Sequence, residues 1–255
     1  MDDRILVIPP IWTANWPPDW RDNQHSTIRT MLSELATVAP VDVFQQPTLK
    51  GGKHRATDVV ALIDVMKQDI KPGHHVVEVG GSPGEPILLA VADSPARSVT
   101  ICGFYPSPRT LARHGDPDLG QAVEAMYRVL TNNPGQAVSI VMEDADEDSR
   151  AEVLEHIEEH VDRVALRRLG DALCDFQFSA EQQVKVPALY LGLKHHVPAN
   201  SGQIEIFREY APRARYDELE LWGPYTHVEA AGYELAGKVT AFIKEVIAGR
   251  ESSGA

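Results

Sequence analysis

The chain has 255 residues, of which 43% are hydrophobic and 24% are charged, and its formal net charge is -13. This balance predicts a globular protein with one sizeable core, and the excess of acidic residues disfavours binding to nucleic acid or to an anionic membrane. The two cysteines, Cys102 and Cys174, stand in no metal or redox motif. The start of the chain has no basic, apolar leader pattern, and we expect a cytoplasmic protein with reduced thiols.

Short apolar strands alternate with segments that carry apolar residues at helical spacing. The predicted strands cover residues 4-8, 41-45, 75-80, 98-103, 186-192 and 214-222. The clearest helical stripe closes the chain with Leu235, Val239, Phe242, Ile243 and Val246. This alternation predicts an α/β fold, with a mostly parallel sheet of about six strands and helices on both faces.

The alternation stops between Phe104 and Gln183, where two long amphipathic segments replace strands. The second segment places its predicted core stripe on Val153, Leu154, Ile157, Val161 and Val164. An insertion at this point of the chain is expected to lie over the carboxyl ends of the strands, where open α/β sheets bind their ligands. We predict a core domain of residues 1-103 and 184-255, with residues 104-183 inserted as a helical lid, called the cap below.

The third predicted strand runs directly into Gly80-Gly81-Ser82-Pro83-Gly84, which has the pattern G-x-S-x-G. A short apolar strand before this pattern is typical of a nucleophile elbow, a strained strand-to-helix turn that exposes a serine. Glu78 lies inside that strand, where a carboxyl group is either a buried structural partner or a member of the site.

The order of these motifs resembles that of the α/β-hydrolase superfamily over nearly the whole chain. Gly80, Ser82 and Gly84 match the family's elbow, and 222-227 resembles the loop that delivers a triad histidine. The resemblance implies that Ser82 is the nucleophile and His227 the general base that takes its proton. The chain begins at what resembles the family's third strand, so the usual amino-terminal hairpin is expected to be missing.

Two residues depart from the family's catalytic pattern. His195 occupies the position of the triad acid, and a neutral imidazole can orient His227 but cannot stabilise an imidazolium as a carboxylate does. Pro83 lacks the backbone N–H that normally supplies half of the oxyanion hole, although proline is also favoured at the first turn of a helix. Acids elsewhere in the chain that could replace the triad carboxylate are Asp116, Asp118 and Asp175.

The loop after the first strand departs as well, because it reads Pro9-Pro10-Ile11-Trp12-Thr13-Ala14-Asn15-Trp16. Oxyanion donors there could be the N–H groups of Ile11 or Trp12, or the side chains of Thr13 or Asn15. The aromatic side chains of these loops favour a small, largely apolar substrate. The candidate substrate-binding residues are Ile11, Trp12, Asn15, Gly81, Pro83, Tyr105 and Tyr225.

Three functions fit this sequence. The first is hydrolysis of an ester, thioester or lactone through Ser82 and His227. The second is a non-hydrolytic lyase, isomerase or cyclase in which His227 transfers protons, and the third is a small-molecule binding protein without turnover. The adjacent histidine pairs cannot hold one ion, and His156 and His160 have helical metal spacing but no H-E-x-x-H motif. The glycines do not form a dinucleotide motif, so we expect no metal and no cofactor. The expected partner is a small-molecule substrate, with a homo-oligomer possible through the cap.

Overall fold

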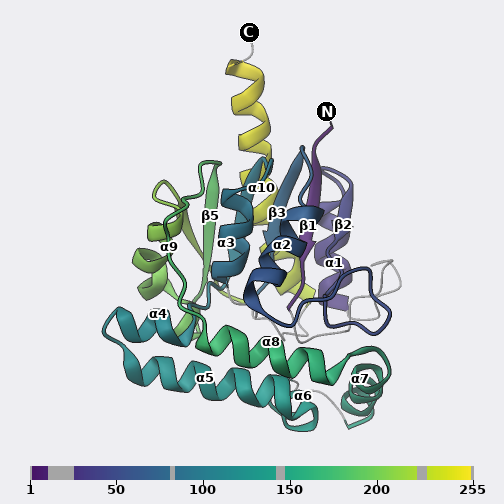
Figure 1. The fold of residues 1–255 in the computed structure, drawn as a ribbon. Coiled ribbons are helices and arrows are strands. Elements are labelled where there is room, and N and C mark those ends of the chain that lie inside the picture. Colours follow the sequence, from purple (N-terminus) through teal and green to yellow (C-terminus); the bar gives the residue numbers. More distant parts are fainter. Residues whose placement is uncertain (1, 11–25, 81–83, 142–146, 223–228, 254–255) are drawn as a thin grey trace.

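The computed structural model describes residues 2–10, 26–80, 84–141, 147–222 and 229–253 (Figure 1). Its strands form one six-stranded sheet of order β2-β1-β3-β4-β5-β6, in which every neighbouring pair is parallel. The strands are β1 (Arg4–Ile8), β2 (Val41–Val43), β3 (His74–Glu78), β4 (Ser98–Cys102), β5 (Ala188–Leu193) and β6 (Arg215–Leu219). Each overlaps a strand expected from the sequence, and the predicted α/β fold is confirmed.

Helices cover both faces of the sheet, because successive strand residues point to opposite sides. Val77 packs in a core with α1 (Ser26–Leu35) and α10 (Glu229–Ser253). On the other face Val76 packs in a core with α2 (Val59–Asp69), α3 (Gly84–Ala92) and α9 (Ile204–Tyr210). None of the described helices combines the length and the apolar character that a membrane span requires.

Among the described residues, five helices connect β4 to β5, and Figure 1 shows α5 and α8 side by side across the end of the sheet where the strands finish. Three of these helices have an N-cap side chain that accepts backbone N–H groups of the first turn. The N-cap residues are Ser107 for α4, Asp116 for α5 and Asp162 for α8. The helices are α4 (Pro108–Arg113), α5 (Pro117–Asn132), α6 (Pro134–Val141), α7 (Glu147–His160) and α8 (Arg163–Asp175).

The expected second segment of the cap is not one helix. Helix α7 ends at His160, Val161 forms an isolated antiparallel bridge with Leu49, and α8 begins at Arg163. Because the helix is interrupted, the residues of α8 do not continue the buried face of α7. Val164 is therefore 62% exposed instead of lying in the core with Ile157. The placement of Val164 in the core is therefore wrong.

Candidate active site

The candidate elbow lies at the centre of the sheet. Strand β3, which leads into it, is flanked by β1 and β4, and it ends at Glu78. Helix α3 begins at Gly84 and packs on the same sheet. Ser82 lies between these elements, with Gly81 and Pro83, outside the described residues. The described flanks are therefore a strand before the motif's serine and a helix after it, as a nucleophile elbow requires.

Two glycines are required at the flanks of this turn. Gly80 has a φ of 95°, a conformation that side-chain-bearing residues rarely adopt, and its N–H donates to the buried Glu78 carboxyl at 2.8 Å. A Cβ at Gly84 would lie 2.3 Å from the ring of Phe104. The backbone N–H of Gly84 also donates to the carbonyl of Tyr105 at 3.4 Å. The start of α3 is therefore held closely against the segment that follows β4.

Tyr105, one of the candidate substrate-binding residues, is buried in the core that α1 and α10 form with the sheet. Its backbone supports the start of α3, as described above. A contact between its side chain and a substrate stays a prediction.

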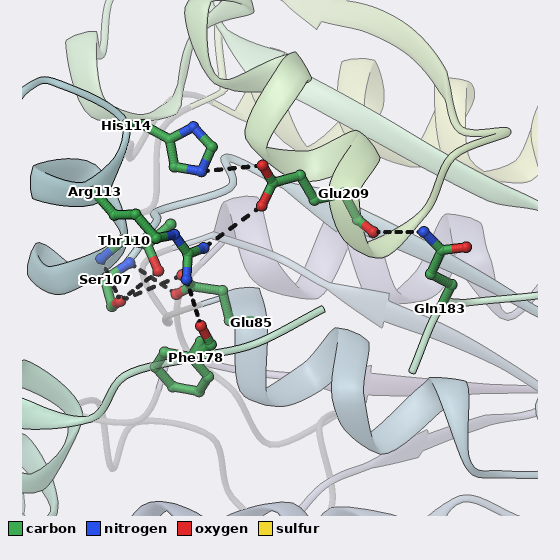
Figure 2. A network of polar contacts seen from close by, with 8 residues as sticks. All are labelled: Glu85, Ser107, Thr110, Arg113, His114, Phe178, Gln183 and Glu209. Atoms are coloured by element: carbon green, nitrogen blue, oxygen red, sulfur yellow. Dashed lines mark hydrogen bonds and ion pairs between the residues drawn. The ribbon is translucent and has the colours of Figure 1, made fainter. Parts of the chain in front are cut away.

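A buried carboxyl group follows the elbow. Glu85, in the first turn of α3, is completely buried, and its carboxyl accepts the Ser107 N–H at 2.8 Å and the Ser107 hydroxyl at 3.3 Å (Figure 2). Burial raises the pKa of Glu85 to about 7, although hydrogen bonds from Thr110 and Ser107 oppose the shift. Near neutral pH this carboxyl is therefore partly protonated.

The same network holds both connections between the core and the cap (Figure 2). Ser107 begins α4, which is the entry to the cap, and Arg113 of that helix donates to the carbonyl of Phe178, on the exit, at 2.7 Å. Arg113 also pairs with Glu209 of α9 at 3.5 Å. Glu85 was not singled out in the sequence, although it is the one charged residue in the otherwise apolar segment Gly84–Ala92.

The segment that leads to His227 is held from two sides. The carboxylate of Glu234 in α10 accepts the backbone N–H groups of Glu220, Leu221 and Trp222 at 2.7, 2.9 and 3.2 Å. The indole N–H of buried Trp222 donates to the carbonyl of Val79 at 3.1 Å.

This indole bond joins the two candidate catalytic segments. Val79 precedes Ser82 by three residues, and Trp222 precedes His227 by five. His227 itself, like Tyr225, lies outside the described residues. The bond therefore holds together the two described residues, Val79 and Trp222, from which the chain continues toward the two candidate catalytic groups.

Solved structures of similar architecture cover almost the entire chain. A hydrolase from Oleispira antarctica has a TM-score of 0.67 at 12% identity, covering 96% of this chain and 92% of its own. The epoxide hydrolase of Bacillus megaterium has a TM-score of 0.66 at 10% identity, with 97% and 94% covered. The chain has the α/β-hydrolase fold. An esterase from Exiguobacterium antarcticum gives 0.65 at 13% identity, with 95% and 92% covered.

No protein-family model and no curated protein matched the sequence. At identities of 10 to 13%, the structural similarity establishes the fold alone, and activity has to be argued from the residues of this chain.

His195, which was predicted to occupy the position of the triad acid, is exposed just after β5. Its neighbour Lys194 pairs with Glu220 at 2.7 Å, and this pairing, with a smaller contribution from His195, lowers the pKa of Glu220. His195 thus lies near the beginning of the segment that leads to His227. Its orienting role stays a prediction.

The alternative triad acids belong to the cap. Asp116 caps α5 by accepting the N–H of Leu119 at 3.0 Å, and Asp175 pairs with Arg109 at 3.3 Å. Asp118 is exposed in the first turn of α5. A catalytic role of these three acids stays a prediction.

The candidate oxyanion loop begins at Pro9 and Pro10, whose carbonyls accept the side-chain N–H of buried Gln46 at 2.5 and 3.2 Å. Sequence reasoning missed Gln46, which fixes the entry to this loop. The residues Ile11, Trp12 and Asn15 lie outside the described residues. In the described ranges, no cluster of three or more histidine, cysteine or acidic side chains could hold a metal ion.

Proposed function

We propose that this protein is an enzyme that hydrolyses an ester, thioester or lactone of a small, largely apolar molecule through Ser82 and His227. The observation that carries the proposal is the bond from Trp222 to Val79, because it joins the strand entering G-x-S-x-G to the segment leading to the only histidine of that loop. Structural neighbours that are an esterase and a thioesterase support hydrolysis on this fold.

In the proposed reaction, the Ser82 hydroxyl oxygen attacks the carbonyl carbon while His227 takes the hydroxyl proton. The tetrahedral intermediate expels the leaving group, which receives that proton from His227. Water, activated by the same imidazole, then hydrolyses the acyl-enzyme and releases the acid. His195 orients His227 in this scheme.

The oxyanion requires N–H donors, and Pro83 supplies none from its backbone. The proposal assigns this task to the loop after β1, through the N–H groups of Ile11 or Trp12 or the side chain of Asn15. Gln46 contributes indirectly, because its bonds to Pro9 and Pro10 fix the start of that loop.

Turnover of a panel of short-chain esters, thioesters and lactones tests this proposal. Replacing Ser82 with alanine should lower kcat at least about 10³-fold, since the nucleophile has no substitute in such a mechanism. Ser139→Ala, at an exposed serine of α6, is the matched control and should leave turnover unchanged. Equal turnover by Ser82→Ala and wild type would refute nucleophilic catalysis by Ser82.

A second candidate function is a lyase, isomerase or cyclase in which His227 transfers a proton. The observation that favours it is the coincidence of Pro83 and His195, which weakens the oxyanion hole and the triad independently. In that case His227→Ala abolishes turnover and no acyl-enzyme accumulates. Saturable binding of small apolar molecules without any turnover would instead support a binding protein.

A further inference from the structure

Helices α5 and α8 of the cap form a hollow of about 440 Å³ that the proposed hydrolysis does not use. Its wall includes Asn132 at the end of α5 and Arg163, Arg167 and Arg168 of α8. All four side chains are exposed. The lining residues come from the end of α5 and from residues 163–171 of α8, and these two helices run side by side in Figure 1.

The positive charge of the three arginines is not neutralised by the part of the chain that the structure describes. The acidic groups beside them are already engaged elsewhere. The Asp171 carboxylate forms an ion pair with the Arg128 guanidinium at 2.7 Å. Asp162 pairs with Arg55 at 3.1 Å and also accepts two backbone N–H groups at the start of α8.

Most of the described arginines, in contrast, form an ion pair with a carboxylate. These are Arg4, Arg55, Arg109, Arg113, Arg128, Arg208, Arg215 and Arg250. In a chain with a net charge of -13, three guanidinium groups that have no carboxylate partner among the described residues form a local positive region around one hollow.

The arrangement suits phosphate groups. Arg163 and Arg167 are four residues apart on α8 and therefore project from the same side of the helix. A guanidinium presents paired N–H donors that match the oxygens of a phosphate, and the Asn132 amide adds a neutral donor. The volume lies in the range of small-molecule sites of roughly 300–1,000 Å³.

We propose that this hollow binds a soluble, phosphate-bearing small molecule with at least two negative charges. Its concave shape favours a small molecule over a flat protein surface. Three arginines require more than one charge in the ligand for full pairing. None of the residues that line the hollow is a candidate catalytic residue, and the proposal does not depend on the proposed hydrolysis.

Calorimetric titration with inorganic pyrophosphate at constant ionic strength tests the proposal. The wild type should bind one equivalent saturably. Arg163→Gln/Arg167→Gln should raise Kd at least about tenfold, because two charge-assisted contacts are lost. Arg29→Gln is the matched control, since Arg29 of α1 is exposed and has no carboxylate partner among the described residues. It should leave Kd unchanged.

Three results would overturn the proposal: no saturable binding by the wild type, equal Kd for the double variant, or an equal loss in the Arg29→Gln control. Cosedimentation with phosphatidic acid vesicles distinguishes a membrane headgroup from a soluble ligand. Vesicle binding without pyrophosphate binding would also contradict the proposal. If the double variant fails to fold by circular dichroism, Arg168→Gln alone serves as the test and should raise Kd several-fold.

Discussion

The backbone N–H of Ser107 donates a 2.8 Å hydrogen bond to the buried carboxyl of Glu85, and this bond joins the helix after the candidate elbow to the entry of the cap. Glu85 follows Ser82 by three residues, and Ser107 begins α4. The hydrogen bond therefore couples the position of the cap entry to that of the first turn of α3. We expect Glu85 to position the elbow as well as to stabilise the fold.

Replacing Glu85 with glutamine should alter the pH dependence of stability. The folded-state pKa of about 7 lies above the ordinary value of 4.5, so the stabilisation is fully present below pH 4.5 and is lost as the pH rises through about 7. The full effect is on the order of 3 kcal/mol, and Glu85→Gln should remove this slope because the amide stays neutral. Urea denaturation at several pH values between 5 and 8 gives the free energy of unfolding at each pH, and so measures this slope.

Two comparisons make this measurement specific. The lowered pKa values of buried His74 and His75 oppose the slope, but they do so equally in both proteins, so the difference between variant and wild type isolates Glu85. Glu205→Gln, at an exposed glutamate of α9, should leave the slope unchanged. An identical pH dependence of wild type and Glu85→Gln would show that Glu85 does not titrate in this range.

Gly84→Ala should destabilise the protein by about 1–3 kcal/mol, because the new methyl group overlaps the Phe104 ring, which is packed against Phe207. Urea denaturation measures the change. Gly237→Ala in α10 is the control, since a methyl group there meets no atom within 4 Å and alanine is the better helix former. If Gly84→Ala left the free energy of unfolding unchanged, Gly84 would not be packed against Phe104.

Glu234→Ala should weaken the anchoring of the segment before His227. Three backbone N–H groups lose their shared acceptor, and we expect a loss of about 1–2 kcal/mol together with slower reaction of the candidate serine with an ester. Denaturation and the ester assay measure these two effects. Glu234→Gln retains an acceptor oxygen and should recover part of both, whereas unchanged stability and rate in Glu234→Ala would contradict the anchoring role.

The sheet was predictable because buried parallel strands are short apolar runs, and β1 and β4 fall within the ranges expected for them. Strand β6 is shorter than expected and ends at Leu219. The N–H groups of Leu221 and Trp222 bond to Glu234 instead of continuing the strand.

The supports of the candidate site were less predictable, because they depend on tertiary contacts. Ser107 is 22 residues from Glu85, and Trp222 is 143 residues from Val79, so no local pattern reports either bond. The sequence also failed to predict which residues of the cap helices face the core. The pairing of Val161 with Leu49 divides α7 from α8, and the helical spacing of the sequence does not reveal that division.

Intact-protein mass after incubation with a fluorophosphonate tests most directly whether Ser82 is an activated nucleophile. We predict a single adduct on the wild type, no adduct on Ser82→Ala, and labelling at least about 10²-fold slower on His227→Ala because the base is missing. An adduct that persists in Ser82→Ala, or a folded wild type that never reacts, would contradict the account.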